Sequence, residues 1–319
     1  MREIACCALF VFLPGGASLA WPFDGHTIPE PVISTRVLDG NELLKIGEIH
    51  DVQNHFLEAL TYYQQALTAF REKKQRRGEA IVLEKIGQVY ARQGKMEEAH
   101  KTLAQAVASS ARIPDRMLHA RSLLALGRVS FSLGKLAEAN ELYQKAGAAF
   151  ERTDDLHGRN EVVLQLGLLR VSAGRLDEGL ALLIRSLEDA RKRRDRVQVI
   201  TAAMGVGDVR MRDDQIEAAR LLYQEGLSLA ESDQNLSAEA DLRARLAKVS
   251  NLTGRRAEAL VLAHRALTLY QTLRDRPREA EMHSQLAEVY EADGDHDRAN
   301  DHRRQAAMVE LSIRIQQGH

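Results

Sequence analysis

The sequence predicts an all-α protein, an α-solenoid of about seven helix-turn-helix repeats, and three observations carry this prediction. Small residues recur every 40 residues with no insertion or deletion. A residue that tolerates positive φ recurs with the same period, as a turn after a helix requires. Hydrophobic residues make up 45% of the chain and aromatic residues only 5%, which suits alanine- and leucine-rich helices better than a sheet.

The first 20 residues differ in kind from the rest of the chain. After Met1 and Arg2 comes the apolar run IACCALFVFL, then PGG, then ASLA before Trp21. A charged start, a short apolar core and small residues around a cleavage point are typical of a secretory signal peptide. We expect export to the periplasm or the extracellular space after cleavage near Ala20. An uncleaved N-terminal membrane anchor is the alternative, and no membrane span is expected after cleavage, because the apolar core is about half as long as a spanning helix.

Residues 21–38 carry three prolines and show no helical period, so they are expected to form an extended tail. The helical pattern begins at Asp39, which can cap a helix while Glu42 reaches back to it. The solenoid is then expected over residues 39–317. Its seven repeats are predicted near residues 40–73, 80–113, 120–153, 160–193, 200–233, 240–273 and 280–313.

A small residue stands at one fixed point of each first helix. These residues are Gly47, Gly87, Gly127, Gly167, Gly207, Ala247 and Ala287. Another small residue follows twelve positions later, at Ala59, Ala99, Ala139, Gly179, Ala219, Ala259 and Ala299. Glycine inside a helix costs about 1 kcal/mol relative to alanine, so the column needs a packing reason. We expect each glycine to mark a crossing where small side chains let two helix backbones approach closely.

The turn inside each repeat has its own column of glycine, asparagine and aspartate. Its members are Asn54, Gly94, Gly134, Gly174, Asp214, Gly254 and Gly294. These residue types take the left-handed conformation most readily. We therefore expect each of them to end a first helix with positive φ.

Together the columns resemble the tetratricopeptide repeat. The pattern is best kept in the second repeat, at Leu83, Ile86, Gly87, Tyr90, Gly94, Ala99, Leu103 and Ala106. The resemblance covers about residues 40–313, although Arg303 replaces an apolar residue in the last repeat. The 40-residue period is similar to that of a longer-helix subclass found in signalling and regulatory proteins. The resemblance implies a right-handed superhelix whose first helices line a concave groove.

The sequence offers no catalytic or cofactor motif. Lys and Arg number 44 and Asp and Glu 45, so the net charge of −1 gives no global attraction to nucleic acid. The acidic segment 291–297 lacks the spacing of a calcium loop, since Arg298 and Arg304 stand at its glycine and acid positions. No metalloprotease helix or nucleophile elbow is present. We expect no enzyme activity, no metal, no cofactor and no nucleic-acid partner.

Three basic runs, at residues 71–77, 191–196 and 274–278, fall near the ends of second helices. Cations there complement the helix dipole, which favours a solvated edge. A docking site for an acidic partner is the alternative.

The resemblance implies that first-helix positions outside the small-residue column line the groove. The ends of this groove are polar, with Glu48 and Asp51 in the first repeat and Glu288 and Glu291 in the last. Apolar and arginine side chains occupy its middle, at Arg121, Leu124, Arg128, Phe131, Leu164, Leu168, Val171, Met204 and Met211. An exposed apolar patch of this kind indicates an interaction site. Burial of the same positions against neighbouring repeats is the alternative.

The sequence therefore predicts a non-enzymatic scaffold or assembly factor of the cell envelope. Its partner would be a protein or peptide with apolar character, with or without acidic groups. One alternative is a cytoplasmic ligand-sensing or regulatory module. The other is a self-assembling homo-oligomer, in which the tail fills its own groove or that of a neighbour. The apolar residues of that tail are Trp21, Phe23, Ile28 and Val32.

Overall fold

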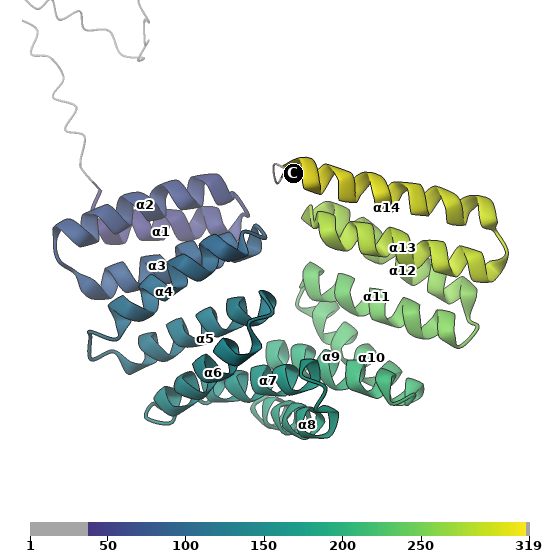
Figure 1. The fold of residues 1–319 in the computed structure, drawn as a ribbon, viewed down its shortest axis with the longest axis horizontal. Coiled ribbons are helices and arrows are strands. Elements are labelled where there is room, and N and C mark those ends of the chain that lie inside the picture. Colours follow the sequence, from purple (N-terminus) through teal and green to yellow (C-terminus); the bar gives the residue numbers. More distant parts are fainter. Residues whose placement is uncertain (1–37, 317–319) are drawn as a thin grey trace, which may run out of the picture. The chain divides into compact units, whose positions relative to one another are not determined.

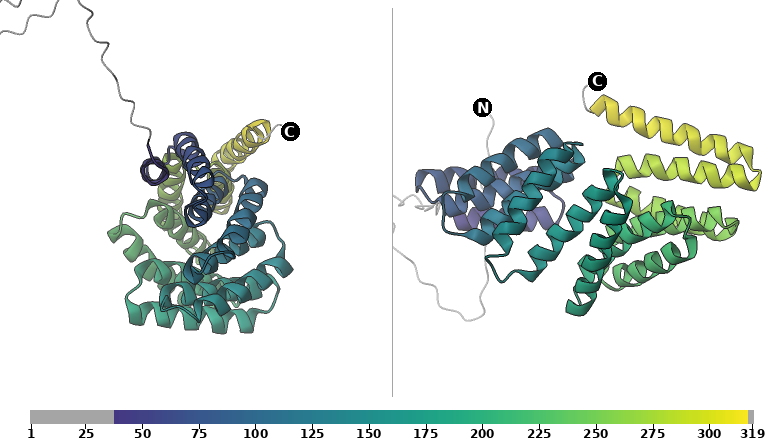
Figure 2. Two further views of the ribbon diagram at one scale, coloured as in Figure 1. Left: turned by 90° about the vertical axis from the view of Figure 1, so that its left-hand side faces the viewer. Right: turned by 60° about the horizontal axis from the view of Figure 1, so that its bottom comes forward.

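The structure is a computed structural model that describes residues 38–316. This part of the chain contains fourteen α-helices in consecutive pairs and no strand. Figure 1 shows the helices stacked in chain order, each beside the next, and the two views of Figure 2 agree. The expected signal peptide, residues 1–20, lies outside the described residues, as does all but the last residue of the expected tail 21–38.

The helices keep the period that the sequence predicts. From α4 on, each helix begins 40 residues after its counterpart in the preceding pair. The first helices are α1 (Gly40–Val52), α3 (Arg76–Arg92), α5 (Arg116–Ser132), α7 (Leu156–Ser172), α9 (Arg196–Arg212), α11 (Leu236–Leu252) and α13 (Arg276–Asp293). The second helices are α2 (Phe56–Glu72), α4 (Met96–Ser110), α6 (Leu136–Phe150), α8 (Leu176–Arg193), α10 (Ile216–Ser232), α12 (Arg256–Leu273) and α14 (His296–Gln316).

The first helix begins at Gly40, as predicted, but from α3 on the first helices begin about four residues earlier than the predicted repeat boundaries, for example at Arg76 instead of near residue 80. Their N-caps explain this difference. Asp115, Asp155 and Asp195 each accept a hydrogen bond from the backbone N–H three residues on, which starts the helix at the residue after the cap. Pro277 fits the same scheme, because proline is tolerated in the first turn.

The capping box expected at the start of α1 is confirmed. The Asp39 carboxylate accepts hydrogen bonds from the backbone N–H groups of Asn41 and Glu42, at 2.8 and 2.9 Å. The Glu42 carboxylate in turn accepts a bond from the Asp39 N–H at 2.9 Å. Two N–H groups of the first turn and that of the cap residue are thereby satisfied, so the helix has a defined beginning.

The turn column is confirmed at all seven positions, where φ lies between 58° at Asp214 and 83° at Gly294. A second set of left-handed residues joins one repeat to the next, namely Lys74, Arg194, Gln234 and Arg274. The residue types of this second set do not signal positive φ, so the sequence did not reveal it. Pro114 occupies the same column and cannot adopt that conformation, and α4 ends earlier, at Ser110.

The mid-helix glycines accommodate bulky side chains, which corrects the expectation that they face small ones. A Cβ atom added at Gly127 would lie 2.6 Å from the ring of Tyr143, sixteen residues later. The same clash would arise at Gly47 with Tyr63 and at Gly87 with Leu103. The glycine therefore provides the space into which the largest core side chain of the second helix packs. Close backbone approach is a second effect, seen where Gly179 lies near the Gly167 carbonyl.

The volumes of the two partners compensate across the repeats. Where the first helix carries alanine at Ala247, the residue sixteen positions later is the small Ala263. In the last pair the partner of Ala287 is Arg303, an exposed residue that donates a hydrogen bond to Glu291 at 2.9 Å. Five successive pairs of glycine with tyrosine or leucine are thus followed by one pair of small residues, and the cores stay filled.

Neighbouring first helices contact one another directly, including α3 with α5, α5 with α7 and α11 with α13. Second helices instead pack against the first helices before and after them. The first helices thus lie closer together than the second helices, so their side is the concave side of the stack. We call this side the inner face, and it comprises the first-helix columns that contain Arg121, Leu124, Arg128 and Phe131.

Each of the three basic runs has an arginine that binds an acidic group of another element. Arg71 of α2 pairs with Glu79 of α3 at 3.0 Å, and Arg278 of α13 pairs with Asp241 of α11 at 2.9 Å. Arg196 pairs with Asp233 of the following second helix at 2.9 Å. These contacts link successive elements along the edge of the stack. Since these arginines remain partly exposed, the contacts favour the solvated edge over a docking site for an acidic partner.

Three histidines from three successive helices meet in the last repeats. His283 Nδ1 of α13 lies 2.9 Å from His302 Nδ1 of α14, and His264 Nε2 of α12 lies 3.0 Å from the Tyr290 hydroxyl. A neutral imidazole has one donor and one acceptor, so only one ring of the His283–His302 pair can donate. Burial lowers the pKa of all three histidines. The cluster therefore favours neutral rings.

No helix within residues 38–316 is both long and apolar enough to cross a membrane.

We predict opposite effects for the same substitution at two glycines. Gly127→Ala should destabilise the protein by about 1 to 3 kcal/mol, because its methyl group would overlap the Tyr143 ring. Gly147→Ala should stabilise it by about 0.5 to 1 kcal/mol, since the new Cβ would have its nearest neighbour at 3.4 Å and alanine favours the helix. Urea unfolding followed by circular dichroism measures both changes. Equal effects would contradict the assigned packing.

The histidine cluster predicts acid sensitivity of the last repeats. In the folded protein the pKa values of the three histidines lie below the ordinary 6.5, so folding favours their neutral rings. Their contribution to the free energy of unfolding is therefore complete above pH 6.5 and is lost as the pH falls below it. The Arg298 charge adds to this effect at His264, whereas Glu279 and Asp301 oppose it at the other two rings.

We therefore compare backbone hydrogen exchange at pH 7.5 and pH 5, corrected for intrinsic exchange rates. On lowering the pH, exchange in α13 and α14 should increase more than exchange in α3 and α4. The variant His302→Gln should reduce this difference, because glutamine can still bond to His283 but does not titrate. His55→Gln, at an exposed histidine in the first turn, is the control. An unchanged difference in His302→Gln would rule out the cluster as its cause.

Candidate binding site on the inner face

Ion pairs connect successive first helices along the inner face. Glu48 of α1 pairs with Lys85 of α3 at 3.0 Å, and Asp51 pairs with Arg92. The remaining pairs are Glu84 with Arg121 at 3.5 Å, Arg128 with Glu161 at 3.9 Å, Asp208 with Arg245 at 2.8 Å and Asp241 with Arg278 at 2.9 Å. Between α7 and α9 no ion pair is formed by the described inner-face residues, and apolar packing takes its place.

Each of the later pairs also receives a tyrosine from a second helix. The Asp208 carboxylate accepts a hydrogen bond from the Tyr223 hydroxyl at 2.7 Å and two from the Arg245 guanidinium at 2.8 and 3.0 Å. Burial, followed by the negative charge of Asp208, raises the pKa of Tyr223. Burial disfavours the Arg245 cation, but the contacts with Asp208 outweigh it and raise the pKa of Arg245. The tyrosine stays neutral and the arginine charged, so this junction keeps its charges over the physiological range.

Several predicted groove residues are core residues, which corrects the expectation that they are exposed. Leu164 has no exposed surface, and Leu124 and Val171 are each only 8% exposed. The cause is the direct contact between neighbouring first helices, which covers positions on the flank of each helix. The alternative of burial against neighbouring repeats therefore holds for these three residues, and they are not available to a partner.

The other predicted residues remain accessible to different degrees. The side chains of Arg121 and Arg128 are 54% and 62% exposed. Four apolar side chains are half-buried against the core clusters of their own repeats, namely Phe131, Leu168, Met204 and Met211. Leu168 reaches across to α9, where its Cδ2 lies 3.2 Å from the position of a Cβ atom built on Gly205. The middle of the inner face is therefore an apolar surface that is half covered.

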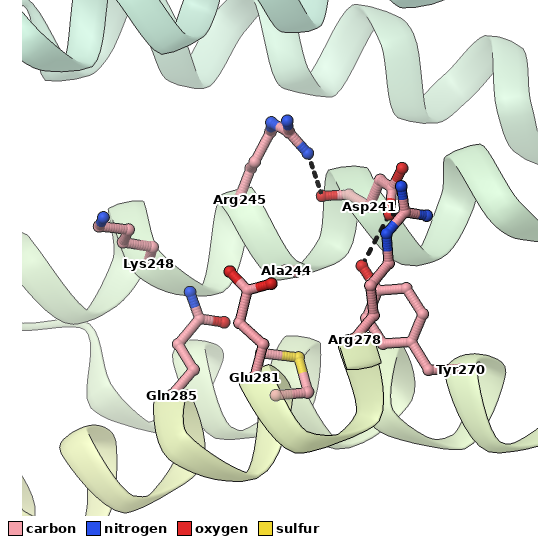
Figure 3. A pocket seen from close by; sticks show the side chains of 9 residues that line it. Asp241, Ala244, Arg245, Lys248, Tyr270, Arg278, Glu281 and Gln285 are labelled. Carbon is pink, nitrogen blue, oxygen red and sulfur yellow. Dashed lines mark hydrogen bonds and ion pairs between the residues drawn. The ribbon is translucent and has the colours of Figure 1, made fainter. Parts of the chain in front are cut away.

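A pocket of about 300 Å³ lies between α11 and α13 (Figure 3). Arg245 and Lys248 enter it from α11, and Arg278, Glu281 and Gln285 enter it from α13. Asp241, Ala244, Tyr270 and Met282 complete its lining. Sequence reasoning missed this pocket, although a signal was present. Lys248 stands in the same 40-residue column as Arg128 and Leu168.

No group of three or more histidine, cysteine or acidic side chains within residues 38–316 has the arrangement of a metal site.

The sequence profile of the tetratricopeptide repeat family matches residues 42–111 and 78–152. Residues 42–152 are tetratricopeptide repeats. The profile covers the first three helix pairs, and the later pairs repeat the same helices, turns and 40-residue spacing. No curated protein is similar in sequence to the chain as a whole.

Solved structures with the same fold extend the comparison to most of this tetratricopeptide repeat array. A Rap protein complexed with competence and sporulation factor has a TM-score of 0.71 at 12% identity, over 89% of this chain and 79% of that one. A Rap conjugation gene regulator of the plasmid pLS20, solved with a Phr peptide, has a TM-score of 0.67 at 15% identity, over 92% and 80%. BtubC from P. vanneervenii has a TM-score of 0.58 at 18% sequence identity, over 69% of this chain and 92% of that one. At these identities the similarity concerns the fold.

Proposed function

We propose that this protein is a non-enzymatic scaffold or assembly factor that binds a protein or peptide on its inner face. The observation that carries the proposal is the middle of that face, where half-buried Leu168 of α7 and Met204 and Met211 of α9 follow the accessible Arg128 of α5. Methionine side chains adapt to partners of different shape, and arginine suits an acidic group beside an apolar one. The near-neutral net charge supports a protein or peptide over nucleic acid.

The fold comparison adds support for a peptide partner. Two of the similar structures are complexes, one with a Phr peptide and one with competence and sporulation factor. Their similarity to this chain extends over most of both chains, so a groove of comparable length is available here. A regulatory module that senses a ligand is the second candidate, since one of these neighbours is described as a conjugation gene regulator.

The location that we propose is the cell envelope. Its support is the sequence of residues 1–20, whose order of charge, apolar core and small residues is that of a secretory signal peptide. A regulatory module in the cytoplasm would keep those residues.

The proposed location predicts a mature N-terminus. Expression in the native host followed by N-terminal sequencing of the purified protein should give a chain that begins at Trp21. Recovery of a soluble cytosolic chain with residues 1–20 intact would exclude export and favour the regulatory alternative.

The proposed groove predicts selective peptide binding. A library of random dodecapeptides displayed on phage should yield binders of the wild-type protein that are enriched in apolar residues. Met211→Gln should weaken those binders by about tenfold or more, because truncating or replacing a central apolar anchor commonly costs 2 kcal/mol or more. Its melting temperature should change little, since Met211 is half-exposed and glutamine has a similar length and helix propensity.

Met308→Gln is the matched control for this experiment, since Met308 is 70% exposed on α14, outside the inner face. It should leave both binding and melting temperature unchanged. A library that yields no binders, or binders equally weakened by the control, would refute peptide recognition on the inner face.

A further inference from the structure

The ion pairs of the inner face are interrupted between α11 and α13. Asp241 and Arg278 pair near the beginning of the two helices, as described above. Further along, Lys248 of α11 and Glu281 of α13 both line the pocket, and within residues 38–316 neither forms an ion pair. The equivalent charges of an earlier repeat, Arg128 of α5 and Glu161 of α7, are paired across first helices at 3.9 Å. The pocket thus retains one cation and one anion that the fold does not use.

The arginines of the pocket are already neutralised. Arg245 binds both carboxylate oxygens of Asp208, and Arg278 binds Asp241 and Asp275. Lys248 is therefore the cation that remains available to a carboxylate entering from outside.

The pocket also holds an unsatisfied hydrogen-bond acceptor. The side-chain oxygen of Gln285 is buried and has no hydrogen-bond partner, and neither has that of Asn251, one turn beyond Lys248 on the facing helix. Buried polar atoms normally have partners, because leaving one unpaired costs about 1 to 3 kcal/mol. Amide groups at these positions can pair with a peptide backbone, whose N–H and C=O groups match them in number and kind.

We propose that this pocket receives an aspartate or glutamate side chain of an extended peptide bound on the inner face. The carboxylate pairs with Lys248, and a backbone N–H of the same segment donates to the Gln285 side-chain oxygen. The Glu281 carboxylate repels an anion placed on the α13 side, so the acidic side chain is directed toward α11. An extended peptide offers a carboxylate and a backbone N–H within one residue, which this arrangement requires. The proposal rests on the peptide-binding function proposed above and specifies one residue of its ligand.

The test uses the full-length mature protein and the same random dodecapeptide library. Wild-type protein should select peptides that combine apolar residues with at least one aspartate or glutamate. Lys248→Glu should lose the acidic enrichment, gain lysine or arginine in its place and keep the apolar enrichment. A synthetic acidic peptide from the wild-type selection should bind Lys248→Glu about tenfold more weakly, with a smaller loss for Lys248→Met. Added salt should narrow the difference between wild type and Lys248→Glu, because it screens both the attraction to lysine and the repulsion by glutamate.

Lys101→Glu is the matched control, because Lys101 is an exposed lysine of α4 with no ion pair. It should select the same peptides as wild type. Melting temperatures of all three variants should match wild type, since neither lysine is buried.

The outcomes separate the two proposals. The pocket assignment would be overturned, and peptide binding left intact, if the wild-type protein selected apolar peptides without acidic enrichment. The same conclusion would follow if the acidic enrichment persisted in Lys248→Glu or disappeared in Lys101→Glu. Failure to select any peptide would overturn both.

Discussion

The contact between a mid-helix glycine and a bulky side chain of the following helix determines how each helix pair closes. Tyr143 fills the space beside Gly127 so completely that a single methyl group would overlap its ring. Because packed interiors resist changes of even one methylene, this contact fixes the relative position of the two helices. A repeat of constant length then carries the same geometry from pair to pair, and the first helices come into contact along one side.

The tyrosines of this packing connect the core to the inner face. The ring of Tyr223 lies against Gly207, while its hydroxyl group donates to Asp208, which also holds Arg245 of the next first helix. One side chain thus takes part in packing within a repeat and in the ion pair between repeats. Changes in this column are therefore expected to alter stability and the inner face together.

The inner face divides into regions of different chemistry. Paired charges join the first four first helices, an apolar contact joins α7 to α9, and an incompletely paired pocket lies between α11 and α13. Ion pairs between successive first helices contribute mainly to the stacking of the repeats, because both of their charges are already neutralised. Groups that the fold leaves unpaired, such as Lys248 and the Gln285 oxygen, are those with interactions to offer a partner.

Local features of the chain could be predicted from the sequence because they depend on the backbone of a few neighbouring residues. The positive φ at Gly134 and Asn54 and the capping box at Asp39 are requirements that the residue type itself signals. The period of the helices followed from the same columns.

Only the tertiary structure decided which inner-face side chains are open. Leu164 and Leu168 are one turn apart on the same helix, yet Leu164 has no exposed surface and Leu168 is half-buried. The difference arises from the neighbouring first helices, whose position no local pattern encodes. The pocket of Lys248 and Gln285 depends in the same way on two helices whose residues lie about 40 positions apart in the chain. Whether a charge such as that of Lys248 is paired depends on which side chains the adjacent helix places beside it.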